Sequence, residues 1–387
     1  TTNALKAEVT YDGQSSLTIT NAVDSEKAHI QVKKDFNDWN NSANEFTFTL
    51  KAGNYYKPGE TEPSDKVTVP MPEGAKDGSV SGKATSAAPN VDFGAITYKK
   101  AGTYHYTITE TNDGRDGVSY DTTEHTVTVM VSKASDRTNK LSASVKYDGD
   151  QDSLTISNTF TPVETSIGLT KQFLNKETNE NWPVDTSFTF DLKADSNTAG
   201  VVKNPMPEIT AVTATKEQPK VSFGNSNSNI TFSKAGTYYY TLTERNGQVD
   251  GVSYDAAPHT VAVVVSKEDS ANNKLSAKVY YDVTKSDKGT VPKDASKSLT
   301  INNTYTPLKQ TLQVTKAFNG WKDWNLFDDD RFTFTLTPVT AGAPMPAGEN
   351  GGKAVASKES PEAIFGEITY TKAGTYEYQI TETNDHL

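Results

Sequence analysis

Polar residues recur in this sequence at strand positions where apolar side chains are expected. The stretch Tyr104–Glu110 alternates as a β-strand, so that Tyr104, Tyr106, Ile108 and Glu110 share one face. A glutamate therefore ends an apolar face. Carboxylates are almost never fully buried unless a neighbouring group makes burial favourable. The pattern indicates that this glutamate has a buried partner.

A lysine and an asparagine occupy comparable inward positions on two other strands. In Ile30–Phe36 the alternation places Lys34 on the apolar face. In a later strand Asn158 follows Leu154 and Ile156 on one face. Equivalent positions hold Glu244 and Glu382 for the glutamate, Lys171 and Lys316 for the lysine, and Asn21 and Asn303 for the asparagine.

Two interpretations fit a buried lysine, glutamate and asparagine. The first is an ion pair between Lys34 and Glu110 with Asn158 hydrogen-bonded beside it, although buried ion pairs rarely gain stability over apolar packing. The second is chemical, because burial lowers a lysine pKa and raises a glutamate pKa. A neutral amine is a nucleophile, and a neutral acid can polarise the asparagine carbonyl and pass a proton to leaving ammonia. The product is an amide bond between two side chains, favoured by the proximity that the fold imposes.

Internal repeats organise the chain. Two complete units span 25–162 and 163–307, each with the same order of Phe-Thr-Phe, Pro-Met-Pro, Phe-Gly and Gly-Val-Ser-Tyr-Asp motifs. Residues 308–387 match the N-terminal part of a further unit, and residues 1–24 match the C-terminal strands of a preceding one. The simplest interpretation is a window cut from a longer tandem array.

Each unit contains many short strands separated by turn residues, without a convincing amphipathic helix. This pattern predicts an all-β protein made of antiparallel, immunoglobulin-like β-sandwich domains in tandem. The linkers between units are only a few residues long. We therefore expect the domains to form an elongated rod.

Composition excludes several classes of site. The chain has no cysteine, which removes disulfides, cysteine nucleophiles and thiolate metal ligands, and its net charge of −11 disfavours nucleic acid. No apolar run could span a membrane, and no signal peptide or anchor is evident. Asp148–Asp152 lacks the spacing of a calcium loop, and His125 and His259, at equivalent strand starts, are expected to be structural. We expect no cofactor and no metal.

These units resemble the isopeptide-linkage domains of streptococcal major pilins and related Gram-positive surface adhesins. The resemblance rests on a Lys-x-Phe first strand, on Tyr-Thr-Ile-Thr-Glu and on Leu-Thr-Ile-x-Asn. It implies spontaneous intramolecular bonds, each with a catalytic glutamate: Lys34 to Asn158 with Glu110, and Lys171 to Asn303 with Glu244. Lys316 and Glu382 have no asparagine of their own unit in the chain, and Asn21 has no lysine. We expect neither Lys316 nor Asn21 to form a bond within the molecule.

The resemblance also suggests a function. The first hypothesis is a stalk or pilus-like shaft of a bacterial adhesin, extracellular, belonging to a cell-wall-anchored parent, and not an enzyme beyond its single-turnover bond formation. Its partners are the neighbouring repeats of the same chain. The alternative is an adhesin module that binds a host glycan or protein, with contacts expected where the repeats diverge most, at Lys51–Lys66, Val283–Lys293 and Trp321–Asp330.

Overall fold

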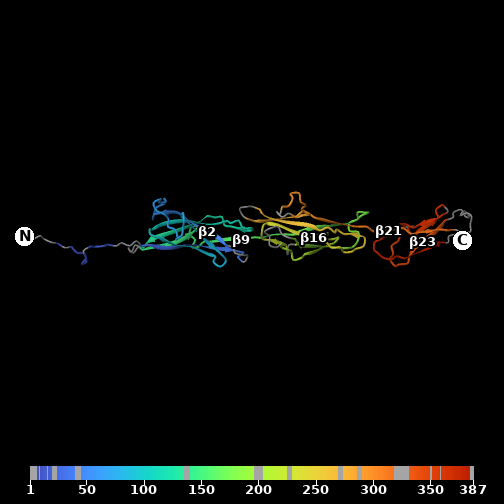
Figure 1. Cartoon of the computed structure of the whole chain (residues 1–387), viewed down its shortest axis with the longest axis horizontal. Coiled ribbons are helices and arrows are strands. Elements are labelled where there is room, and N and C mark those ends of the chain that lie inside the picture. Colours follow the sequence, from blue (N-terminus) through green and yellow to red (C-terminus); the bar gives the residue numbers. More distant parts are fainter. Residues whose placement is uncertain are drawn as a thin grey trace, which may run out of the picture. The chain divides into compact units, whose positions relative to one another are not determined.

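The computed structural model contains β-strands as its only regular elements within the residues it describes (Figure 1). Two compact units are distinguished, one comprising Thr1–Pro162 with Lys267–Ser276 and the other Val163–Ser266 with Ala277–Leu387. No helix in the described part of the chain is long and apolar enough to cross a membrane. The described residues are 7, 9–14, 16–19, 24–39, 45–134, 140–195, 204–224, 229–268, 273–285, 290–317, 331–348, 351–357 and 359–383.

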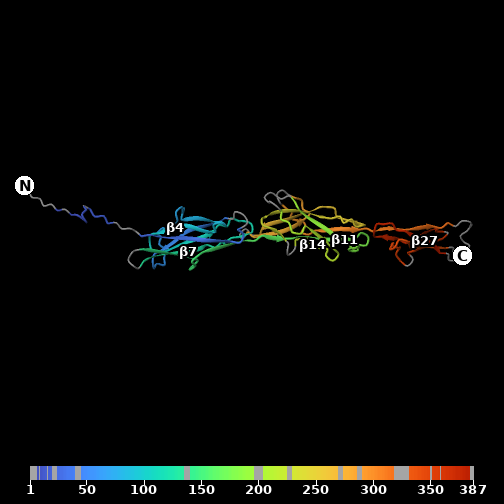
Figure 2. The same cartoon turned by 90° about the horizontal axis from the view of Figure 1, so that it is seen from below.

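The first complete repeat is a sandwich of two sheets with strand orders β4-β1-β9-β6 and β3-β2-β5-β7-β8. Figure 2 shows β4 and β7, which belong to different sheets of this sandwich. Alternating burial along each strand directs one row of side chains between the sheets. The strands are β1 Glu26–Phe36, β2 Phe46–Tyr56, β3 Ser79–Ala84, β4 Asn90–Tyr98, β5 Gly102–Glu110, β6 Val118–Ser119, β7 His125–Lys133, β8 Leu141–Tyr147 and β9 Thr155–Phe160.

One strand pair departs from the antiparallel sandwich that the sequence predicts. The first and last strands, β1 and β9, run parallel, with Lys34 opposite Ile156 and Phe36 opposite Asn158. All other pairs in this repeat are antiparallel. The parallel pairing brings the two ends of the repeat together within one sheet.

Aromatic side chains fill the core between the two sheets. Tyr98 and Tyr106 are fully buried, and their hydroxyl oxygens lie 3.0 Å apart. The Tyr106 hydroxyl also donates to the carbonyl of Pro70 at 2.8 Å, which fixes the Pro-Met-Pro loop. The same bond recurs from Tyr240 to Pro205 at 2.7 Å. The buried tyrosines thus hold a loop while their rings pack in the core.

The second complete repeat has the same two-sheet design. Its sheets have strand orders β14-β11-β20-β17 and β13-β12-β16-β18-β19, and β11 and β20 again run parallel. Strands β10 and β15 form a further, two-stranded antiparallel sheet. The strands are β10 Val163–Thr165, β11 Ile167–Asn175, β12 Phe188–Ala194, β13 Ala211–Ala214, β14 Lys220–Phe223, β15 Ile230–Phe232, β16 Gly236–Glu244, β17 Val252–Ser253, β18 His259–Lys267, β19 Leu275–Tyr281 and β20 Thr300–Tyr305.

The third repeat contains a sheet of order β24-β23-β27 and two short pairs, β21 with β26 and β22 with β25. The inward position expected for Lys316 implies a first strand like Ile30–Phe36, but β22 covers only Gln313–Thr315, and Phe318 lies outside the described residues. Trp321–Asp330 also lies outside the described residues. The strands are β21 Leu308–Gln310, β22 Gln313–Thr315, β23 Phe332–Pro338, β24 Lys353–Ala356, β25 Glu362–Ile364, β26 Ile368–Tyr370 and β27 Tyr378–Thr383.

Residues 1–24 form no named strand in their described part. An isolated bridge joins Tyr11 to Gln14, and Ile19 is 76% exposed. Asn21 lies outside the described residues. The strand pattern of Leu17-Thr18-Ile19 therefore has no sheet partner among the described residues of this chain.

Candidate cross-linking site

The first repeat brings Lys34, Glu110 and Asn158 together between its two sheets. Lys34 on β1 and Asn158 on β9 come from one sheet, and Glu110 on β5 reaches them from the other. Lys34 Nζ lies 2.7 Å from Glu110 Oε1, and Asn158 Nδ2 donates to the same oxygen at 2.9 Å. The side chains of the lysine and the glutamate are 0% exposed. One carboxylate oxygen thus lies between the amine and the amide nitrogen.

The second repeat reproduces this arrangement. Lys171 Nζ lies 2.8 Å from Glu244 Oε1, and Asn303 Nδ2 donates to that oxygen at 2.9 Å. The registers match as well, because Phe173 lies opposite Asn303 as Phe36 does opposite Asn158. The geometry is therefore a property of the repeat and not of one local sequence.

Two phenylalanines from the Phe-Thr-Phe strand enclose the lysine head group. Lys34 Nζ lies 4.6 Å from the ring centre of Phe46 and 5.7 Å from that of Phe48. The Glu110 carboxylate, 2.7 Å away, is the charged partner of this buried nitrogen. Sequence reasoning used the Phe-Thr-Phe motif only as a repeat marker. Its spacing of two residues, which puts both rings on one face, could have indicated this role.

Burial governs the protonation of both lysines. Desolvation lowers the pKa of Lys34, although the nearby Glu110 carboxylate opposes the shift. The same cause lowers the pKa of Lys171 to about 8. An ammonium group without water is costly, and the neutral amine is the nucleophilic form. The enclosure therefore favours the reactive state of the lysine.

The backbone N–H of Asp121 is a component of the site that the sequence did not reveal. It faces Glu110 Oε2 at 3.2 Å and Asn158 Oδ1 at 3.3 Å. Asp255 repeats both contacts in the second repeat, at 3.0 and 3.1 Å. The sequence predicted that the glutamate would donate to the asparagine carbonyl. In the structure the glutamate meets the amide nitrogen instead, and a main-chain donor meets the carbonyl.

The Gly-Val-Ser-Tyr-Asp motif delivers that donor. Gly117 has a φ of 72°, and a side chain there would lie 2.8 Å from the carbonyl oxygen of Thr161. Glycine alone tolerates both the left-handed backbone and this close approach. The turn leads into β6, which pairs with β9 through Val118 and Phe160. The motif therefore fixes the position of Asp121 beside the end of β9.

The third repeat holds a partial version of the site. Lys316 Nζ lies 2.6 Å from Glu382 Oε1, and the two side chains are 16% and 38% exposed. The Lys316 nitrogen also lies 4.1 Å from the ring centre of Phe332. No strand equivalent to β9 pairs with β22 among the described residues. The pair is therefore more exposed to water than its counterparts.

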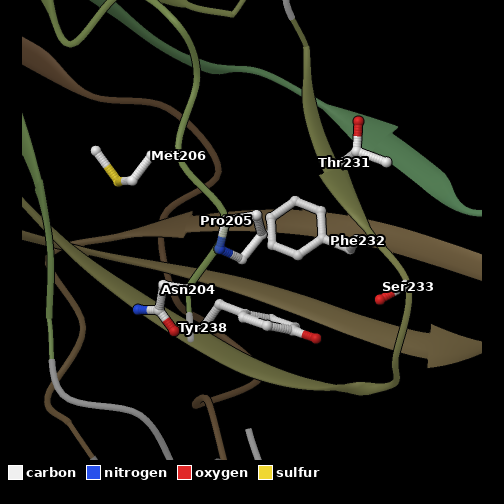
Figure 3. A pocket seen from close by; sticks show the side chains of 7 residues that line it. All are labelled: Asn204, Pro205, Met206, Thr231, Phe232, Ser233 and Tyr238. Carbon is white, nitrogen blue, oxygen red and sulfur yellow. The ribbon is translucent and has the colours of Figure 1, made fainter. Parts of the chain in front are cut away.

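A pocket of about 430 Å³ in the second repeat lies apart from these side chains (Figure 3). Asn204 there stands where the first and third repeats have Val69 and Ala343. Its Nδ2 donates to the carbonyls of Asp195 and Tyr239, so it ties the Pro-Met-Pro loop to β16 and to the residue that follows β12. The lining consists of Asn204, Pro205, Met206, Thr231, Phe232, Ser233 and Tyr238, without a charged side chain and outside the stretches expected to bind ligand.

The fold and the repeated lysine, glutamate and asparagine define the class of the protein: tandem immunoglobulin-like β-sandwich domains with a buried polar triplet. A family model described as FctA, Spy0128-like isopeptide containing domain, matches residues 30–161, 167–306 and 312–386. The chain belongs to this family, a pilin family of Gram-positive bacteria whose members lie at the cell surface. No curated protein matches the sequence.

Solved structures that are similar to the chain come from Gram-positive bacteria. A major pilin of Streptococcus pyogenes is 17% identical, covering 73% of this chain and 100% of its own, with a TM-score of 0.32. Two B repeat units of the collagen binding protein of Staphylococcus aureus are 16% identical, covering 94% and 69%, with a TM-score of 0.27. The Bacillus anthracis TIE protein is 14% identical, covering 94% and 53%, with a TM-score of 0.25. Because these scores are low, family membership rests on the family model.

Proposed function

We propose that the chain forms part of the stalk of a Gram-positive surface adhesin or pilus, anchored through its parent protein to the cell wall. Each complete repeat is locked by a spontaneous bond, Lys34 to Asn158 and Lys171 to Asn303. One observation carries the proposal: in both repeats the amine and the amide nitrogen lie within 3 Å of the same glutamate oxygen. That oxygen can take a proton from one nitrogen and return it to the other.

The proposed reaction begins when Lys34 gives a proton to Glu110 and becomes a neutral amine. The amine attacks Cγ of Asn158, and the negative charge that develops on Oδ1 meets the Asp121 N–H. The bond from Cγ to Nδ2 then breaks as Glu110 returns its proton to that nitrogen. The products are a secondary amide and ammonia, which leaves with the second proton of the original ammonium group.

The proposed bond suits a stalk because of where it lies. It joins the first and last strands of a repeat, so that it closes a loop of roughly 120–130 residues and stabilises the fold by on the order of 4–5 kcal/mol by loop-closure reasoning. A pulling force that enters at β1 and leaves at β9 passes through the bond. The chain between these strands then cannot extend. Unlike a disulfide, an amide bond also survives reducing conditions.

Single-molecule pulling on the full chain through its two ends tests the stalk function. We expect neither complete repeat to extend, while the third repeat, in which no strand equivalent to β9 pairs with β22 among the described residues, unfolds at ordinary force. The Lys34→Met variant provides the matched control. Without the first bond, its pulling trace should contain one additional unfolding step, with the length of one complete repeat. Extension of both complete repeats in the unmodified chain would contradict the proposal.

A further inference from the structure

An Asp-His-Asp chain lies directly behind the main-chain donor of the first repeat. His125, at the start of β7, has Nε2 3.1 Å from Asp121 Oδ2 and Nδ1 2.7 Å from Asp148 Oδ2. Asp121 Oδ1 accepts a hydrogen bond from the N–H of Thr123 at 2.8 Å, and Asp148 Oδ1 accepts one from Thr126 at 2.9 Å. Asp121 is therefore held on two sides, and its own N–H is the one that faces the cross-linking site.

The second repeat contains the same chain. His259 Nε2 lies 3.2 Å from Asp255 Oδ2, and its Nδ1 lies 2.7 Å from Asp282 Oδ1. Asp255 Oδ1 accepts a hydrogen bond from the N–H of Ala257 at 2.9 Å. Two histidines and four aspartates thus keep their geometry between repeats whose intervening loops differ. A merely solvated turn would not require this.

The position of His125 sets its charge. A neutral imidazole has only one N–H, so contacts from both ring nitrogens to two carboxylates require the protonated ring. Although burial works against the charge, the hydrogen bonds to Asp148 and Asp121 hold the pKa of His125 above its usual value. The His125 side chain is 11% exposed, whereas the carboxylates of Asp121 and Asp148 are 24% and 41% exposed, so the ring is the most enclosed member of the chain.

The charge of Asp121 creates the need for this histidine. The Asp121 carboxylate favours the charged form of Lys34, as does Glu110, whereas Arg115 opposes it. A bare carboxylate beside the site would also oppose negative charge on Asn158 Oδ1. A cation bonded to Asp121 offsets both effects. The developing negative charge on Asn158 Oδ1 then faces the N–H of Asp121 and not an uncompensated carboxylate.

We propose that His125 with Asp148, and His259 with Asp282, are positioning residues that hold the N–H of Asp121 and of Asp255 as the oxyanion donor for bond formation. The inference rests on the proposed cross-linking function and adds a component to it. His125 transfers no proton in the reaction and keeps both of its own while the bond forms. Its contribution is to fix Asp121 and to neutralise the carboxylate of that residue.

The test follows bond formation in the full chain, pulse-labelled by cell-free synthesis and then chased into buffers of different pH. Peptide mapping distinguishes the Lys34–Asn158 product from the Lys171–Asn303 product, so the second repeat serves as an internal reference. We expect His125→Gln to slow the first bond by about tenfold or more, which is less than the effect of removing an oxyanion donor outright. The control His29→Gln replaces an exposed histidine of the same repeat that bonds to Asp92, and it should change neither rate.

The pH profile separates positioning from a general loss of structure. In the unsubstituted chain the rate of the first bond should fall as rising pH removes the proton of His125, whose pKa the hydrogen bonds to Asp148 and Asp121 hold above its usual value. In His125→Gln the falling limb should be absent. Protease resistance measured on the same samples reports folding. If the His125→Gln chain does not become protease-resistant, the Asp148→Asn variant is used to test the positioning role instead. The introduced amide would still accept a hydrogen bond from His125, but without the carboxylate the pKa of His125 should fall. The falling limb of the pH profile should therefore move to lower pH.

Each outcome has a definite meaning. Equal rates and equal pH profiles for His125→Gln and the unsubstituted chain would overturn the positioning role while leaving the cross-link intact. If His125→Gln does not fold, an unchanged profile for Asp148→Asn would overturn it equally. Absence of both bonds from the unsubstituted chain would instead refute the proposed function itself.

Discussion

Lys34 and Asn158 lie on neighbouring parallel strands, with Asn158 two residues beyond Ile156, the direct partner of Lys34. Both side chains point between the sheets, where Glu110 from the opposite sheet meets them. Because β1 is the first strand of the repeat and β9 its last, a bond between these residues encloses nearly the whole domain. The predictions below follow from this relationship.

Removal of the glutamate should stop one bond and leave the other. Glu110→Ala deletes the oxygen that lies between Lys34 Nζ and Asn158 Nδ2. The first repeat should therefore release no ammonia, while the second repeat should still release one molecule. Glu110→Gln, which keeps the shape of the side chain without the basic carboxylate oxygen, should give the same result as Glu110→Ala. Intact mass checks both variants, with Glu244→Ala as the reciprocal control. Normal mass loss in either Glu110 variant would show that the glutamate is not required.

Loss of the first bond should lower stability in one repeat only. Lys34→Met keeps an unbranched side chain in the core but cannot form an amide, so the free energy of unfolding of the first repeat should fall by on the order of 4–5 kcal/mol. Calorimetry should show one transition at a lower temperature. Lys316→Met is the matched control and should leave the transitions of the two complete repeats unchanged. Equal effects of the two substitutions would argue against a bond at Lys34.

The pH dependence of stability should reveal an unreacted lysine. In Asn303→Ala, Lys171 stays an amine whose pKa burial lowers from 10.5 to about 8. Between these values the unfolded chain binds more protons than the folded one, so the free energy of unfolding should rise with pH. Below pH 8 the lysine is charged in both states and contributes no slope. Each pKa unit of difference between the folded and unfolded states changes the free energy of unfolding by about 1.4 kcal/mol.

Denaturant unfolding of Asn303→Ala from pH 7 to 10 measures this rise. The unsubstituted chain supplies the reference, because the amide nitrogen that we propose at Lys171 does not titrate. The variant should gain stability relative to that reference above pH 8. A constant difference between the two chains across this range would mean that Lys171 is not buried as an amine.

Chemical labelling of amines should distinguish Lys34 and Lys171 from Lys316. Amine-reactive labelling in denaturant should leave Lys34 and Lys171 unmodified, since the proposed bonds turn their nitrogens into amides, while Lys316 reacts. The result does not depend on burial, because the chain is unfolded. Complete labelling of all three lysines would contradict both cross-links, and protection of Lys316 would show a bond that we do not expect.

Strand alternation was sufficient to predict the inward positions of Lys34, Glu110 and Asn158, because a period of two leaves only two faces. It could not show that Asp121 contributes, since a main-chain N–H has no signature in a side-chain pattern. It also could not reveal the orientation of the Asn158 amide, which depends on donors from a distant turn. The parallel pairing of β1 with β9 is set by the whole topology, whereas local sequence indicates only that each segment is a strand.

The third repeat shows where local pattern and structure diverge. Its first strand alternates like β1, yet β22 covers only Gln313–Thr315, and no parallel neighbour like β9 pairs with β22 among the described residues. Lys316 is correspondingly more exposed than Lys34. Inward alternation predicts full burial only when the facing and flanking strands are present.

The intact mass of the purified full chain tests the central claim most directly. Two amide bonds between side chains predict a mass lower than that of the sequence by two ammonia molecules. A mass equal to that of the unmodified sequence would contradict the account.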